Sequence, residues 1–186
     1  MTPGAEGQGT VSDGPLAPLT GSAHRILLYC VQMLIVTGVL LHYVVRVSLV
    51  QGASMMPGVV NGERIIVDLL AYRLSIPHRG DVIVFQDPCD RSKDYIKRVI
   101  ALPGETIEIR DGVTYVDGKS LPEPYVTLRD DSDLPPTTLA SNCIWVMGDN
   151  RSNSEDSRTW GPLPLSLVRG QAVLSLWPPS RTFRTM

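Results

Sequence analysis

"TIEIRDGVTYVDG", residues 106–118, is the stretch that most directly indicates the fold, because it reads as a β-hairpin. Asp111-Gly112 and Asp117-Gly118 each offer the two-residue turn that favours tight antiparallel pairing. Similar β-branched runs follow one another from residue 47 onward, separated by Gly, Pro and Asp: "ERIIVDLL", "GDVIVF", "YIKRVIAL", "CIWVMGD" and "GQAVLSLW". No βαβ alternation is visible. We therefore predict a mainly β, antiparallel or barrel-like domain over residues 47–186.

The composition narrows the class of protein. The chain has 15 Pro and 16 Gly but only two Phe, which is typical of a loop-rich β protein. Its net charge is -2 and its 17 basic residues are scattered, so we expect no nucleic-acid partner. No CxxC or Cys/His cluster occurs, and we expect neither a metal nor a cofactor. Cys89 and Cys143 allow one disulfide, although two unpaired thiols fit their spacing equally well.

The first 46 residues contain two segments of different composition. Residues 1–23 are rich in Gly, Pro, Ser and Thr and predict a disordered tail. Residues 24–46 are apolar and carry no formal charge between Arg25 and Arg46, which predicts a single transmembrane anchor. A cleavable signal peptide is an alternative, but its apolar region would be shorter and followed by a small-residue cleavage site. A buried soluble helix would be unusually apolar all round.

A serine and a lysine are the candidates for chemistry. Ser54 lies in "VQGASMMPGVV", residues 50–60, shortly after the apolar segment. Outside that segment His78 is the single histidine, and its Pro-His-Arg context is typical of a surface turn, so a lysine base is the alternative. Lys97 alone among three lysines lies in an apolar strand, where burial would lower its pKa. Arg98 would point to the other side and would need a carboxylate partner.

Four motifs together indicate a family. "ASMMP", "RGDVIVF", "YIKRVIALPGE" and "GDNRSNSEDSRTWG" follow in this order downstream of the apolar segment. They resemble the bacterial type I signal peptidases, or leader peptidases, which are membrane-bound Ser-Lys endopeptidases of protein export. The resemblance covers about residues 50–178, and the last motif is its most specific part.

The resemblance implies a role for each matching residue. It makes Ser54 the nucleophile, Lys97 the general base and Ser154 the group that orients the lysine amine. The backbone N–H of Ser54 would be one oxyanion donor. One branch of the family carries a serine donor two residues earlier, where this chain has Gly52, so the second donor stays unassigned.

The resemblance also implies a substrate groove and two bracing ion pairs. The preprotein would add as a strand, with small residues at positions -1 and -3 before the cut. The residues that would form this groove and the oxyanion hole are Val50, Gln51, Gly52, Ala53, Met55, Tyr95 and Ile96. Asp156 would pair with Arg158, and Asp149 could pair with Arg98. For Met55 and its neighbours Met56, Val59 and Val60, core packing and contact with the membrane surface are equally good interpretations.

The expectation is therefore a serine endopeptidase that cleaves signal peptides from secreted preproteins. The resemblance places it in the cell membrane as a single-pass protein, with its tail in the cytoplasm and its catalytic domain on the extracytoplasmic face. Its partners would be preproteins and the lipid bilayer, and its oligomeric state is open. Two alternatives remain: a self-cleaving Ser-Lys peptidase of the LexA and UmuD kind, and an inactive membrane-anchored β scaffold.

Overall fold

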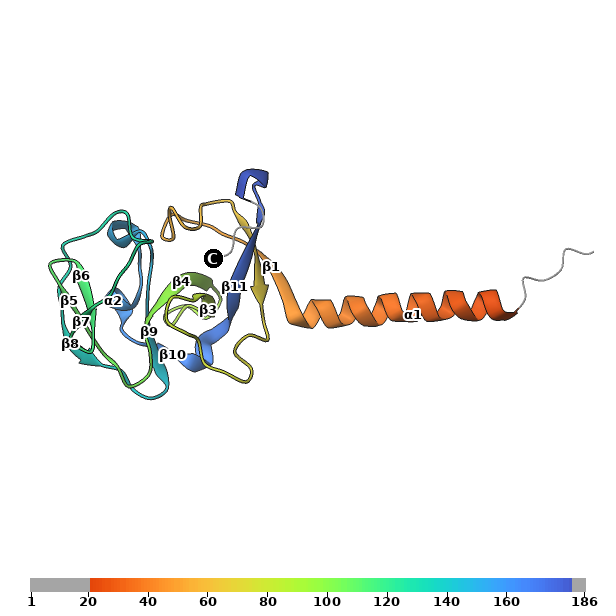
Figure 1. The fold of residues 1–186 in the computed structure, drawn as a ribbon, viewed down its shortest axis with the longest axis horizontal. Helices are drawn as coiled ribbons and strands as arrows, with labels where there is room; N and C mark the ends of the chain where they lie inside the picture. Colours follow the sequence, from red (N-terminus) through yellow and green to blue (C-terminus); the bar gives the residue numbers. More distant parts are fainter. Residues whose placement is uncertain (1–20, 182–186) are drawn as a thin grey trace, which may run out of the picture. The chain divides into compact units, whose positions relative to one another are not determined.

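The computed structural model describes residues 21–181, which form one apolar helix and a mainly β body (Figure 1). This confirms the predicted fold class. Residues 1–20, which make up most of the predicted disordered tail of residues 1–23, lie outside the described residues.

Helix α1 (Gly21–Val44) corresponds to the predicted anchor. Over Gly21–Val39 it is long and apolar enough to cross a bilayer, and those of its side chains whose exposure is described are exposed, apart from Val44 at its end. A signal sequence near an N-terminus would meet the same criterion, so the anchoring role stays a prediction. The helix ends two residues earlier than the predicted segment, because Val45 and Arg46 already pair with the next strand.

The larger sheet of the body contains seven strands. In chain order they are β1 (Val45–Leu49), β2 (Arg64–Asp68), β3 (Val82–Gln86), β4 (Asp94–Ala101), β9 (Cys143–Met147), β10 (Leu163–Pro164) and β11 (Val168–Trp177). Their order across the sheet is β1-β2-β11-β3-β4-β9-β10, and every neighbouring pair is antiparallel. The sheet curls, since Arg46 of β1 approaches Asp94 of β4 to 3.7 Å although three strands lie between them.

The smaller sheet has the strand order β7-β6-β5-β8, and its strands gather on the side of the body away from β1 (Figure 1). They are β5 (Thr106–Arg110), β6 (Val113–Val116), β7 (Lys119–Ser120) and β8 (Leu134–Thr138). Both predicted turns are formed: Asp111 and Asp117 have positive φ angles of 48° and 50°, each followed by a positive-φ glycine. Strand β8 was not predicted, because it contains two prolines, which are tolerated here since β8 is an edge strand.

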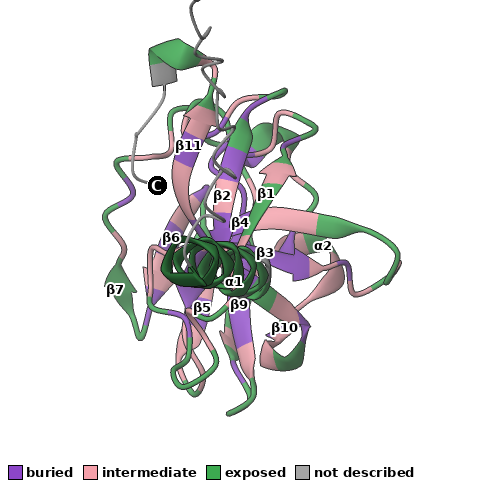
Figure 2. Ribbon diagram, turned by 90° about the vertical axis from the view of Figure 1, so that its right-hand side faces the viewer, coloured by how far each residue is buried: buried purple, intermediate pink, exposed green. Residues whose placement is uncertain are grey.

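Buried side chains form three clusters in the body. Strands β3 and β9 each have four buried residues out of five, and the buried stretch of β9 is purple in Figure 2. Strand β3 contributes to two of the clusters, with Val82 and Val84 in one and Ile83 and Phe85 in another. This follows from the alternation of side chains along a strand that is covered on both faces. The third cluster joins the larger sheet to the smaller one. Four short helices complete the body: η1 (Arg151–Asn153), α2 (Ser157–Trp160), η2 (Leu165–Leu167) and η3 (Pro179–Arg181).

Candidate active site

Ser54 lies in the turn that follows β1, and the segment after β9 holds this turn in place. Asn150 donates from its backbone N–H to the Ser54 carbonyl at 3.0 Å and from its side chain to the Ala53 carbonyl at 3.2 Å. Gly52 has a φ of 102°, a conformation that favours glycine. Its N–H donates to Asn61 Oδ1 at 2.9 Å. The turn that presents Ser54 is therefore fixed from two sides.

Lys97 reaches Ser54 from strand β4, across the curled sheet. Its Nζ lies 2.8 Å from Ser54 Oγ, and the residue is only 4% exposed. Burial lowers the pKa of Lys97 to about 8, while the negative charges of Asp156 and Glu155 act in the opposite direction. A substantial fraction of the amine is therefore neutral near pH 8, in contact with the hydroxyl of a serine.

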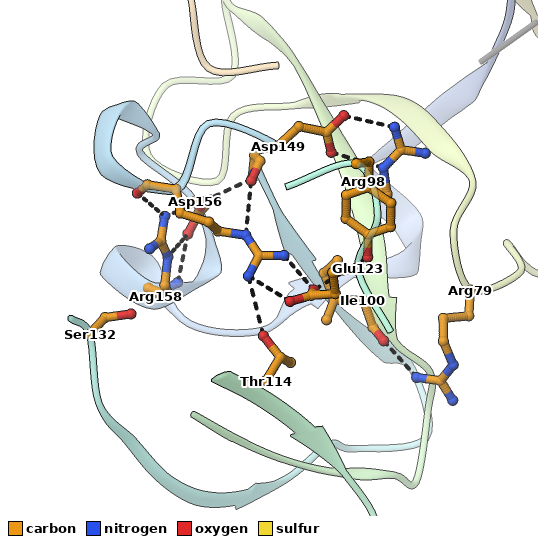
Figure 3. A network of polar contacts seen from close by, with 12 residues as sticks. Arg79, Arg98, Ile100, Thr114, Glu123, Ser132, Asp149, Asp156 and Arg158 are labelled. Carbon is orange, nitrogen blue, oxygen red and sulfur yellow. Dashed lines mark hydrogen bonds and ion pairs between the residues drawn. The ribbon is translucent and has the colours of Figure 1, made fainter. Parts of the chain in front are cut away.

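Arg98, the next residue along β4, binds a carboxylate. Its Nε and Nη2 donate to the two carboxylate oxygens of Asp149 at 2.8 and 2.7 Å, and Nη1 donates to the Gly80 carbonyl at 2.8 Å. The guanidinium also lies 4.4 Å from the centre of the Tyr125 ring. The structure thus brings together the two residues that the sequence proposed as a pair (Figure 3).

The second proposed pair is also formed. Arg158 Nε donates to Asp156 Oδ1 at 2.9 Å, and Arg158 pairs with Asp130 as well. Asp156 is fully buried and accepts from the Gly148 N–H at 3.0 Å. Burial alone would raise the pKa of Asp156, but the hydrogen bonds and charge of Arg158 hold it below its usual value. Asp156 therefore stays a carboxylate that braces the segment after β9 (Figure 3).

Ser154 does not make the predicted hydrogen bond to Lys97. Its Oγ is buried and has no hydrogen-bond partner of good geometry among residues 21–181, although it lies near enough to Asp156 to help stabilise that carboxylate. Ser154 packs closely over Gly148: a Cβ there would lie 2.3 Å from Ser154 Oγ and 2.4 Å from the Ser54 carbonyl oxygen. Ser154 and Ser54 are thus neighbours across a glycine that has no room for a side chain.

Sequence reasoning missed three contributors. Asn61 and Asn150, which hold the Ser54 turn, carried only the signal of ordinary turn residues. Arg151, 3% exposed, forms a buried ion pair with Glu123 and donates to Thr114 Oγ1 at 3.2 Å (Figure 3). This network ties the segment after β9 to the smaller sheet. Its members are far apart in the sequence, so no local pattern could have joined them.

A cleft of about 560 Å³ opens beside Ser54 and Lys97. It lies between β1 with its following segment and the first half of β4. Strand β1 is at the edge of the sheet, and β9 pairs with β4 only from Arg98 onward, so residues 94–97 have no ladder partner on that side. Predicted groove residues that line the cleft are Val50, Gln51, Gly52, Ala53, Tyr95 and Ile96.

Besides the Ser154 hydrogen bond, the predictions for Met55 and for the cysteines differ from the structure. Met55 is 1% exposed and packs in the core with Val59, so its side chain does not line the cleft, whereas Met56 is 40% exposed. Cys89 and Cys143 are both free thiols. Cys89 lies in the loop before β4, whereas Cys143 lies beyond the opposite end of that strand's pairing with β9, so the length of β4 separates them. The structure does not form the disulfide.

No three His, Cys, Asp or Glu side chains within the described residues 21–181 are grouped so that they could hold a metal ion. Ser54 and Lys97 bring a serine hydroxyl and a buried amine to the cleft, whereas the carboxylates of Asp149 and Asp156 are fully buried, each paired with an arginine, and do not line it.

A serine hydroxyl in contact with a buried lysine, on a curled antiparallel sheet, defines a class of hydrolase, and comparison with known proteins identifies the family. Residues 23–177 match the model of the family described as "Signal peptidase, peptidase S26". The chain therefore belongs to the signal peptidase family, S26, of serine endopeptidases.

Several relatives are similar over most of the chain. A Synechocystis protein named probable signal peptidase I-1 is 40% identical over 69% of this chain and 69% of its own length. A Bacillus caldolyticus signal peptidase I is 36% identical over 69% of this chain and 78% of its own length. A solved signal peptidase I from Enterococcus faecalis matches with a TM-score of 0.47 and 33% identity, covering 52% of this chain and 97% of that chain.

Proposed function

We propose that this protein is a membrane-anchored endopeptidase that removes signal peptides from secreted preproteins, with Ser54 as nucleophile and Lys97 as general base. The observation that carries the proposal is the 2.8 Å contact between Lys97 Nζ and Ser54 Oγ, made by a lysine that is 4% exposed. A neutral amine in this position can accept the hydroxyl proton as Ser54 attacks a carbonyl carbon.

The reaction would proceed by acyl transfer. Ser54 attacks the scissile carbonyl, Lys97 takes the proton, and the amine of the leaving polypeptide receives it. Lys97 then deprotonates a water molecule that hydrolyses the acyl-enzyme. The Ser54 N–H donates no hydrogen bond within residues 21–181, which leaves it available to the oxyanion.

Ser154 would act as a positioning residue in the second half of this reaction. Once Ser54 Oγ is acylated, it is a poorer acceptor for the Lys97 amine, which needs another partner. The buried Ser154 hydroxyl, without a partner among the described residues, could provide one. Catalytic hydrogen bonds often form only in a complex, so their absence in the free enzyme is compatible with this role.

The substrate would bind as an added strand between β1 and the first half of β4. Two free strand edges facing one cleft favour an extended peptide, whose backbone can pair with both. We propose that side chains at positions -1 and -3 are small, which is what membership of the signal peptidase family implies. α1 would be the single membrane anchor, with the catalytic body on the extracytoplasmic face.

Preprotein cleavage tests the Ser-Lys assignment. Full-length protein in detergent should cut a preprotein after an Ala-x-Ala sequence, with the site located by mass spectrometry. Ser54→Ala and Lys97→Ala should each abolish cutting. The matched controls are Ser120→Ala and Lys119→Ala, because both residues are exposed on the smaller sheet and do not line the cleft. Near-wild-type turnover in either Ser54→Ala or Lys97→Ala would refute the assignment.

The same assay separates the two alternative functions. A self-cleaving peptidase of the LexA and UmuD kind would cut its own chain and leave added preproteins intact. An inactive scaffold would cut nothing at any pH.

A further inference from the structure

A second cavity, of about 550 Å³, lies at one end of the larger sheet and is rich in arginine. We name it the arginine cavity; its charged lining residues are Arg46, Arg73, Arg91, Arg169 and Asp94. Four guanidinium groups therefore face one carboxylate, in a chain whose net charge is -2. Such a concentration of one charge is a site for an anion.

The arginines are available for a ligand. Arg46 lies 3.7 Å from Asp94, a loose pair in which the Arg46 side chain is 63% exposed. Arg73, Arg91 and Arg169 are exposed, and their side chains form no ion pair with any residue in the described part of the chain. This differs from the arginines near the active site, which bind buried carboxylates. The surplus positive charge is thus not used to hold the fold together.

The antiparallel registers place the arginine cavity at a defined end of the sheet. Val45 of β1 pairs with Asp68 of β2, Asp68 pairs with Gln171 of β11, and Gln86 of β3 pairs with Asp94 of β4. The start of β1 and the ends of β2 and β3 therefore meet at the same end. The chain leaves α1 and begins β1 at this same end, because β1 starts directly after Val44.

Chain connectivity keeps the arginine cavity close to the end of α1. Arg46 is two residues beyond Val44, the last residue of the helix, and two residues span at most about 7 Å. If α1 crosses the bilayer, as the proposed function requires, Arg46 lies near the lipid phosphates whatever angle the helix adopts. Basic residues next to a membrane span are attracted to anionic lipids.

We propose that the arginine cavity binds the phosphate of an anionic lipid headgroup. The inference rests on the membrane anchoring in the proposed function and goes beyond it, because it assigns a lipid class to residues outside the active site. The bound headgroup would lie between Arg73, Arg91 and Arg169, offset part of their positive charge, and attach the end of the sheet to the membrane surface.

Native mass spectrometry of the full-length protein in detergent tests this with phosphatidylglycerol against phosphatidylcholine as the probes. Wild type should bind the first phosphatidylglycerol at least tenfold more tightly. Arg73→Gln/Arg91→Gln/Arg169→Gln should weaken that binding about 100-fold, since each basic residue near an anionic surface contributes about fivefold. The control Arg110→Gln/Lys119→Gln/Arg129→Gln changes the charge equally on exposed positions elsewhere and should change binding less than twofold.

Three outcomes would overturn the proposal. The first is equal binding of the two lipids by wild type, and the second is unchanged phosphatidylglycerol binding by the arginine variant. The third is displacement of the lipid by millimolar inorganic phosphate, which would make the cavity a site for free phosphate. If the arginine variant keeps its phosphatidylglycerol binding and loses cleavage only of preproteins with acidic residues, the cavity is a substrate site and the lipid proposal is refuted.

Preprotein cleavage in detergent distinguishes this proposal from the proposed function. The triple arginine variant should keep its turnover within threefold of wild type, which also shows that it is folded. If it does not fold, single variants replace it, and Arg73→Gln and Arg169→Gln should each weaken phosphatidylglycerol binding about fivefold. A lipid-binding protein that cleaves nothing would refute the peptidase alone, and a peptidase without lipid preference would refute the lipid site alone.

Discussion

Lys97 and Arg98 are consecutive residues of β4, and both side chains are largely removed from water, yet their surroundings give them opposite properties. Arg98 forms two hydrogen bonds with the Asp149 carboxylate, and these offset its burial and raise its pKa further. Lys97 has no carboxylate at ion-pair distance among the described residues, so burial dominates and its pKa falls to about 8. The partner, more than the burial, decides whether a buried cation keeps its proton.

Replacing Lys97 by methionine should have the largest effect, and it should separate activity from stability. We expect Lys97→Met to lower kcat/KM for preprotein cleavage at least 1,000-fold, within the range of about 10²–10⁴ for loss of a general base. Its free energy of unfolding at pH 7 should rise by roughly 2 kcal/mol. The shift of the pKa from 10.5 to about 8 corresponds to roughly 3 kcal/mol, and the lost hydrogen bond to Ser54 subtracts about 1 kcal/mol.

Urea unfolding at several pH values checks the sign of this effect. Between pH 8 and 10.5 only the unfolded chain carries the Lys97 proton, so the stability of wild type rises with pH through this window. Below pH 8 the cost of the buried ammonium is constant, and above pH 10.5 it vanishes. The stability gain of Lys97→Met should therefore disappear at high pH. A variant less stable than wild type at pH 7 would contradict a desolvated lysine.

Replacing Arg98 by methionine should lower the stability, whereas the same change at Lys97 should raise it. We expect Arg98→Met to lower the free energy of unfolding by about 3–5 kcal/mol, because Asp149, which is fully buried, would lose its partner. The double variant Arg98→Met/Asp149→Leu should recover most of this loss, since it removes both charges. Urea denaturation of the three proteins measures the difference, and equal stabilities for Arg98→Met and Lys97→Met would remove the contrast between the two sides of β4.

The sequence was sufficient for much of this arrangement. Short β-branched runs predicted most of the longer strands, and Asp111-Gly112 and Asp117-Gly118 predicted both tight turns. The pairing of Arg98 with Asp149 could also be predicted. An inward-facing arginine on a strand requires a carboxylate, and the GDNRSNSEDSRTWG motif contains Asp149. Local propensity and charge pairing are properties that a sequence carries directly.

Other features depend on packing between distant segments. Whether the Met55 side chain is buried could not be decided from its neighbours in the sequence, because the same apolar residue suits a core or a membrane surface. The Ser154 hydroxyl depends on how closely its segment packs over Gly148, which only the folded chain fixes. The same holds for the ion pair of Arg151 and Glu123, in which the two partners are 28 residues apart.

Ser154→Ala should have a smaller effect than either change on β4. Removing a hydroxyl that has no hydrogen-bond partner among the described residues costs no bond, so the free energy of unfolding should change by less than about 0.5 kcal/mol. If Ser154 positions the Lys97 amine during deacylation, kcat should fall about tenfold, the equivalent of about 1.4 kcal/mol. Pre-steady-state acyl-enzyme accumulation measures the affected step, and unchanged kcat would exclude the positioning role.

Glu155→Gln should have the smallest effect, and it should change the pKa of Lys97 without affecting Arg98. Glu155 is exposed at the rim of the cleft, and its negative charge raises the pKa of Lys97. For wild type, kcat/KM should rise with pH to a midpoint near 8, the pKa of Lys97. Without the Glu155 charge the midpoint should move down by a few tenths of a pH unit, and less at high salt.

The matched control is Asp131→Asn, which removes an exposed carboxylate before β8 and should leave the midpoint in place. A midpoint that does not respond to Glu155→Gln would mean that the titrating group lies away from this cleft, and Lys97 would lose its assignment as the base.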